Sequence, residues 1–134
     1  MAGDRAGKPT EGNDRMGDGR ITTHALDTVA GTPAAALRID LYRVDGDSRL
    51  LVSTTTTNSD GRTDGPILAG ADFKPGSYEI VFHIGAYLEG RGLGERSKMF
   101  LDEVPVRFGI ADATQHYHVP LLFSPYSYST YRGS

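Results

Sequence analysis

Apolar and polar side chains alternate along most of the chain from residue 21 onward. In the stretch 116–123 every second residue is apolar, namely Tyr117, Val119, Leu121 and Phe123. Successive side chains of a strand point to opposite faces, so this spacing predicts a strand with one buried face. His116 and His118 then lie on the face away from the core.

The same period of two predicts further strands, which are separated by turn residues. We expect them at 21–26, 35–44, 50–57, 78–84, 104–110 and 126–131. Asp, Gly, Ser and Pro at 45–48 and 124–125 favour the turns that connect neighbouring strands. Pro105 cannot donate to a sheet ladder and indicates an edge strand or a bulge. Many short strands of this kind are typical of an all-β sandwich or barrel.

Two features of the middle of the chain need a separate interpretation. The segment 85–98 carries four glycines, which weaken a helix, so we expect a connection with at most one short helix. His83 lies on the less apolar face of its strand, and we interpret it as structural.

The length of 134 residues fits one domain. Residues 1–19 contain no aromatic or branched aliphatic side chain, so we expect a disordered arm there and a folded domain over 20–134. This arm also lacks the apolar middle region of a secretory signal, and no Ser-Lys-Leu ending is present. We therefore expect a cytoplasmic protein.

Composition removes several classes of function. The chain has no cysteine, which excludes a disulfide, a thiol nucleophile and Cys-ligated metal. Its formal net charge of -3 gives no basic surface for nucleic acid. Since no apolar run is long enough to span a bilayer, we expect neither a nucleic-acid nor a membrane partner.

The candidate chemistry rests on histidine and arginine. His24, His116 and His118 could converge as a zinc site with an open position for water. Alternatively, a histidine acts as general base on water while Arg62, in the turn-rich loop 58–66, stabilises negative charge on the substrate. A sandwich that only binds small molecules or proteins is the third hypothesis. The residues by themselves leave all three open.

Three separated motifs resemble those of one known family. They are Thr-His-Ala-Leu-Asp at 23–27 followed by Gly-Thr-Pro-Ala at 31–34, Asp-Gly-Arg at 60–62, and Tyr-Arg-Gly-Ser at 131–134. In this order they are similar to the motifs of the 5-hydroxyisourate hydrolases, the transthyretin-related proteins. The hormone-carrying transthyretins have Lys in place of His24 and lack the last motif. The resemblance therefore favours an enzyme over a carrier.

This resemblance implies a transthyretin-like β-sandwich of two four-stranded antiparallel sheets. It also implies a homotetramer with active sites at the dimer–dimer interface. The implied reaction converts 5-hydroxyisourate to 2-oxo-4-hydroxy-4-carboxy-5-ureidoimidazoline in urate degradation, with neither cofactor nor metal. The implied catalytic residues are His24, Arg62, His118 and Ser134. The implied substrate-binding residues are Tyr131, Arg132 and His116.

Overall fold

The computed structural model describes residues 19–133. Residues 1–18 of the expected disordered arm lie outside the described residues. Ser134, at the other end of the chain, also lies outside them. Gly19 is buried, and a Cβ atom at this position would collide with the carbonyl oxygen of Ala113. The folded part of the described chain therefore includes Gly19.

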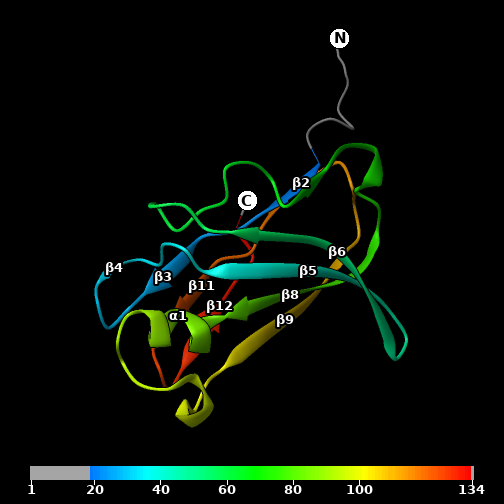
Figure 1. Ribbon diagram of the computed structural model, residues 1–134. Helices are drawn as coiled ribbons and strands as arrows, with labels where there is room; N and C mark the ends of the chain where they lie inside the picture. Colours follow the sequence, from blue (N-terminus) through cyan, green and yellow to red (C-terminus); the bar gives the residue numbers. More distant parts are fainter. Residues whose placement is uncertain (1–18, 134) are drawn as a thin grey trace.

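One layer of the fold is a four-stranded antiparallel sheet with the order β6-β5-β8-β9 (Figure 1). Its strands are β5 (Arg38–Asp45), β6 (Ser48–Thr56), β8 (Gly76–His83) and β9 (Glu103–Ile110). The expected β5–β6 hairpin is confirmed, and Gly46 takes a φ of 59° in its turn. Pro105 lies on β9, at the edge of the sheet, as its missing N–H predicts.

The second layer consists of two short sheets. The first, with the order β10-β2-β7, contains β2 (Arg20–Thr22), β7 (Leu68–Ala69) and β10 (His116–His118). The second, with the order β12-β11-β3-β4, contains β3 (Ala25–Asp27), β4 (Thr32–Pro33), β11 (Leu121–Phe123) and β12 (Tyr128–Thr130). Because β10–β2 and β11–β3 are parallel pairs, the prediction of a second four-stranded antiparallel sheet is wrong.

The two long strands expected in this layer are each interrupted once. Pro120 has no N–H to donate between β10 and β11, and between β2 and β3 the chain turns so that the N–H of Ala25 donates to the carbonyl of Gly61 at 2.8 Å. The ladder nevertheless crosses the gap, since the N–H of Val119 donates to the carbonyl of Thr22 at 2.8 Å. The two short sheets therefore act as one discontinuous layer.

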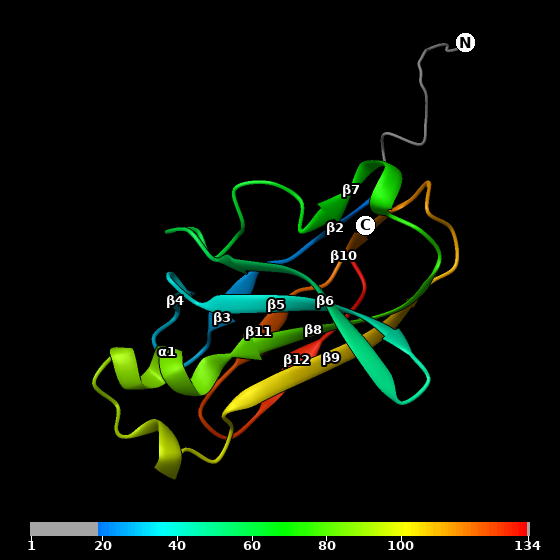
Figure 2. The ribbon, with the colours of Figure 1, turned by 45° about the vertical axis from the view of Figure 1, so that its right-hand side comes forward.

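The core lies between the layers, and the face predicted from 116–123 is buried in it. The α-helix α1 (Ile84–Gly90) closes one end, while β2 and β10 lie at the other (Figure 2). Tyr87 of α1 packs edge-on against Phe123 with ring centroids 5.5 Å apart, and its hydroxyl donates to Asp27 Oδ2. The segment expected as a connection thus begins with a helix whose apolar residues at i, i+3 and i+4 are buried.

Two short 3-10 helices, η3 (Gly70–Asp72) and η4 (Arg96–Lys98), complete the elements. Within 19–133, no helix has both the length and the apolar character needed to cross a membrane. The described chain is thus mostly β with one α-helix.

Candidate functional site

The parallel pairing of β2 with β10 brings together the polar side chains that form one face of the candidate site. Arg20 pairs with His116 and Thr22 with His118, while Ile21 and Tyr117 between them are buried in the core. Side chains two apart on a strand share a face, and paired residues lie side by side. Four polar side chains therefore gather on one face: Arg20, Thr22, His116 and His118.

A rigid loop brings Arg62 to this face. The side-chain oxygen of Asn58 accepts hydrogen bonds from the N–H groups of Asp60 and Arg62, at 2.9 and 3.2 Å. Gly61 has a φ of 74°, and a Cβ atom there would lie 2.4 Å from the carbonyl oxygen of Ala25. Only glycine allows both this conformation and this close approach. The loop therefore packs tightly against the sheet and holds the arginine over its edge.

Together these elements enclose a pocket of about 420 Å³. It is lined by Arg20, Thr22, Thr23, Arg62, Thr63, Gly65, Pro66, His116 and His118. The lining has two arginines and two histidines but no carboxylate side chain. Such a pocket favours an anionic ligand, or a neutral one on which negative charge develops during a reaction.

The two histidines of the pocket share one hydroxyl group. Thr22 Oγ1 lies 2.6 Å from His116 Nε2 and 2.8 Å from His118 Nδ1. The Nδ1 atom of His118 is therefore hydrogen-bonded within the protein. Its Nε2 atom is the nitrogen left to meet a ligand.

The surroundings of both histidines favour the neutral form of the ring. Burial lowers the pKa of His116, and the charges of Arg20 and Arg132 lower it further. Burial likewise lowers the pKa of His118, followed by the charge of Arg62 and of the neighbouring histidines. A neutral imidazole can accept a proton, so His118 suits the role of a general base near neutral pH.

His24 contacts the backbone of the loop that carries Arg62. Its Nε2 atom lies 2.8 Å from the carbonyl oxygen of Asp60 and must donate to it, because a carbonyl only accepts. His24 does not belong to the residues lining the pocket. In the described structure it anchors the loop that carries Arg62.

The segment before residue 134 lies directly beside His118. Gly133 and His118 exchange backbone hydrogen bonds, at 2.7 Å from the glycine N–H and 3.3 Å from the histidine N–H. The histidine ring covers this glycine, since a Cβ atom there would approach the ring Cδ2 atom to 3.0 Å. The expected role of Ser134 concerns a residue outside the described ones.

Two other tail residues were expected to bind substrate. Arg132 donates to Gln115 Oε1 at 3.0 Å and to the carbonyl of His116 at 3.2 Å, and its guanidinium lies 4.2 Å from the centre of the Tyr117 ring. These contacts fasten the tail along β10. Neither Arg132 nor Tyr131, whose side chain is exposed, lines the pocket of the described chain.

Among the pocket residues that sequence reasoning missed, Arg20 and Thr22 share a face with the two histidines. Thr22 stands two positions before His24 in the expected strand 21–26, so the period of two placed it on the face of His24, whereas Arg20 precedes that strand. What the pattern lacked was the partner strand. Only the pairing of β2 with β10 shows that this face meets His116 and His118.

The zinc hypothesis required three histidines around one point. Within residues 19–133, no group of three or more His, Asp or Glu side chains is arranged to hold a metal ion. His24 faces Asp60, while His116 and His118 both turn a ring nitrogen to Thr22. The donor set therefore does not fit a three-histidine zinc site.

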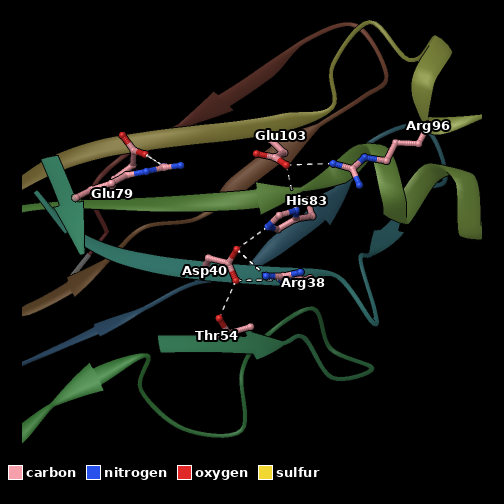
Figure 3. A network of polar contacts seen from close by, with 8 residues as sticks. Arg38, Asp40, Thr54, Glu79, His83, Arg96 and Glu103 are labelled. Carbon is pink, nitrogen blue, oxygen red and sulfur yellow. Dashed lines mark hydrogen bonds and ion pairs between the residues drawn. The ribbon is translucent and has the colours of Figure 1, made fainter. Parts of the chain in front are cut away.

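His83 lies on the other sheet, within a network of charged side chains (Figure 3). Its Nε2 atom donates to Asp40 Oδ2 at 2.8 Å, and its Nδ1 atom lies 3.8 Å from Glu103. Asp40 also accepts from Arg38 and Thr54. This geometry agrees with the structural interpretation of His83.

Comparison with known proteins places the chain among its relatives. The family model described as Transthyretin, HIUase/Transthyretin family, matches residues 21–133. The chain belongs to the HIUase/Transthyretin family. The predicted transthyretin-like fold is thus confirmed, although the second layer differs from the expected four-stranded antiparallel sheet.

Individual members of the family are similar over most of the chain. The 5-hydroxyisourate hydrolase 2 of Rhizobium meliloti (strain 1021) is 61% identical over 116 residues, which are 87% of this chain and 97% of the relative. The structure of Klebsiella pneumoniae 5-hydroxyisourate hydrolase gives a TM-score of 0.72 at 30% identity, covering 87% of this chain and 99% of the other.

The structure of (S)-allantoin synthase gives a TM-score of 0.80 at 45% identity and covers 89% of this chain. The match covers 46% of that protein, so this chain spans about half the length of the synthase.

Proposed function

We propose that this chain is a hydrolase that converts 5-hydroxyisourate to 2-oxo-4-hydroxy-4-carboxy-5-ureidoimidazoline in urate degradation. The high identity to relatives named 5-hydroxyisourate hydrolase supports this reaction. The observation that carries it is a pocket lined by two arginines and two histidines of lowered pKa, with no carboxylate in the lining. Such a site activates water and receives a carboxylate product.

In the proposed reaction, His118 Nε2 takes a proton from water while the water oxygen attacks a ring carbonyl of the substrate. The carbonyl oxygen becomes an oxyanion, which Arg62 stabilises through its positive charge. The C–N bond then breaks, and the departing nitrogen receives the proton from His118. The new carboxylic acid releases its proton to solvent, and the resulting carboxylate suits the cationic lining.

The remaining expected site residues complete the site in this proposal. His24 holds the loop that presents Arg62, as its bond to Asp60 supports. His116 lines the pocket from β10, and Arg132 fastens the tail beside that strand. Tyr131 contacts substrate, and Ser134 takes part in catalysis. The exposed position of the Tyr131 side chain leaves it free to turn toward a ligand.

The test is the absorbance decay of freshly made 5-hydroxyisourate, corrected for its spontaneous breakdown. We expect the full chain to accelerate the decay and a chain lacking residues 131–134 to be slower by orders of magnitude with nearly the same unfolding midpoint. No acceleration by the full chain would overturn the proposed function. Equal rates for the two chains would overturn the role of the tail.

The two alternatives make different predictions in the same assay. A carrier would bind 5-hydroxyisourate or a similar small molecule without turnover. A zinc hydrolase would contain stoichiometric metal by elemental analysis and would lose activity in chelator. We expect activity that persists in chelator, because the histidines do not form a three-ligand site within the described chain.

We further propose a homotetramer with the sites at the dimer–dimer interface, in the cytoplasm. Exposed aromatic side chains on and beside β12, namely Tyr126, Tyr128 and Tyr131, support an interface on this layer. Light scattering should give about four times the mass of one chain. A monomeric mass would remove the interface from the proposal.

A further inference from the structure

The hydroxyl of Thr22 contacts both histidines of the pocket but does not itself enter the reaction proposed above. Its oxygen lies within hydrogen-bond distance of His116 Nε2 and His118 Nδ1, at 2.6 and 2.8 Å. The parallel pairing of β2 with β10 fixes this arrangement, since Thr22 stands directly beside His118. A hydroxyl has one hydrogen to donate and lone pairs to accept with.

Two neutral imidazoles and one hydroxyl can share these contacts in only two ways. In the first, Thr22 donates to His116 Nε2 and accepts from His118 Nδ1–H, which leaves a lone pair on His118 Nε2. In the second, both hydrogen bonds are reversed, and His118 Nε2 carries a hydrogen. In each case the two rings carry their hydrogen on the same kind of nitrogen, both on Nδ1 or both on Nε2.

We propose that Thr22 is a positioning residue whose hydroxyl couples the tautomers of His116 and His118 and holds His118 with a free Nε2 lone pair toward the pocket. Arg62 lines the same pocket as His118. A guanidinium near the open side of the ring favours a lone pair there over an N–H group. The first of the two arrangements is therefore the resting one.

The same contacts move a proton once His118 has taken one from water. The Nδ1 proton of His118 passes to Thr22 Oγ1, and the hydroxyl proton of Thr22 passes to His116 Nε2. Thr22 ends with one hydrogen, His118 is neutral with its hydrogen on Nε2, and His116 carries the positive charge. The charge thus rests on the second ring. The relay runs back, from His116 Nε2 through Thr22 Oγ1 to His118 Nδ1, as His118 Nε2 gives its proton to the departing nitrogen.

The test combines a spectroscopic and a kinetic measurement. Two-bond proton–nitrogen NMR spectra of the full chain with ¹⁵N-labelled histidine, at pH about 8, report which ring nitrogen carries hydrogen. We expect Nδ1–H on both rings in the wild type and loss of this shared state in Thr22→Val. Thr22→Ser keeps the hydroxyl and should restore it. Thr28→Val, which removes a hydroxyl bonded to the carbonyl of Phe123, should leave both rings unchanged.

In the kinetic measurement, we expect Thr22→Val to lower kcat about 10- to 100-fold with KM within about threefold, because the base loses its orientation. Thr22→Ser should stay within about threefold of the wild type. The kinetic half rests on the proposed function, whereas the spectra do not. A wild type with coupled tautomers but no turnover would overturn the proposed function alone.

The coupling itself is overturned by either of two results. One is a wild-type spectrum with hydrogen on Nδ1 of one ring and Nε2 of the other, a result that decides the question even if Thr22→Val does not fold. The other is Thr22→Val with unchanged tautomers and unchanged kcat.

Discussion

His83 and His118 lie on different sheets and meet opposite electrostatic surroundings. His83 donates to Asp40 and faces Glu103, so carboxylates flank its ring (Figure 3). His118 instead shares a pocket with Arg62, and its pKa is lowered by burial and by that charge. The carboxylate of Asp40 holds the His83 ring in place through a hydrogen bond, whereas the charge of Arg62 favours a neutral His118 that can accept a proton. The residue type thus tells little until the charges around it are known.

The largest effect should come from removing the groups that act on substrate. We expect His118→Ala and Arg62→Ala each to lower kcat/KM about 100- to 1,000-fold, or about 3 to 4 kcal/mol of transition-state stabilisation. Unfolding midpoints should change little, since both side chains line an open pocket. Absorbance assays on each variant measure the loss. His83→Ala is the matched control, and a comparable loss in that variant would erase the contrast between the two histidines.

Removing Asp40 should affect stability where the previous variants affect catalysis. Asp40 is almost fully buried and accepts from His83, Arg38 and Thr54. Asp40→Ala leaves these donors without their partner and should lower the free energy of unfolding by about 3 kcal/mol. Urea unfolding measures this. The exposed Asp47→Ala serves as control and should stay within about 0.5 kcal/mol. A catalytic loss in folded Asp40→Ala would contradict the separation of the two regions.

The pH dependence should also separate the two regions. The pKa of His118 lies below its ordinary value of 6.5, so kcat/KM should stay level as the pH falls to 6.5 and decrease only below it. In this window the unfolded chain binds the proton first, so stability decreases as the pH falls below 6.5 and levels off below the folded pKa. A decrease of kcat/KM that begins above pH 6.5 would contradict the neutral state of His118.

Asp40 defines a second window at lower pH. Burial alone would raise its pKa, but the hydrogen bonds from His83, Arg38 and Thr54 together lower it below 3.8. Its contribution to stability is therefore present above pH 3.8 and lost as the pH falls through the folded pKa. We expect the free energy of unfolding of Asp40→Asn, measured against pH, to lack the decrease below pH 3.8 that Asp40 causes. The decrease below pH 6.5 should remain.

The smallest effect should follow from crowding the ring of His118. In Gly133→Ala the new methyl group would lie 3.0 Å from the ring Cδ2 atom, so the ring must shift by a few tenths of an ångström. We expect kcat/KM to decrease about 3- to 10-fold with little change in stability, because precise placement of a base matters more than its packing. Gly90→Ala, which meets nothing within 4 Å, is the control. Equal activity of both variants would show that the ring tolerates displacement.

The hydrophobic pattern predicted correctly which face of each strand is buried, but it did not predict which strands pair. Burial of Tyr117 and Val119, the edge position of Pro105 and the outward direction of His118 all follow from a period of two and from a missing N–H. The parallel pairing of β2 with β10 does not follow, because hydrophobic spacing states which face is buried but not which strand lies beside it. For that reason the position of Thr22 in the site could be recognised only from the structure.

The candidate site was found by motif more than by chemistry. The residues alone left a zinc site, a histidine base and a binding protein open, and the resemblance selected His118 and Arg62. It also selected His24, whose contact with the Asp60 carbonyl no local pattern could predict, since that contact depends on how a loop folds back over a strand.

The pairing of β2 with β10 also determines at which stage of folding the site forms. Thr22 and His118 are separated by 96 positions along the chain, and Thr22 and His116 by 94. Closing so long a loop is among the slow and entropically costly events of folding, whereas the β5–β6 hairpin closes over a few residues. A newly made chain therefore builds its hairpins first and has no competent base until its most distant strands have met. Recovery of activity after denaturation should report the last step of folding, and no half-folded form should turn over substrate.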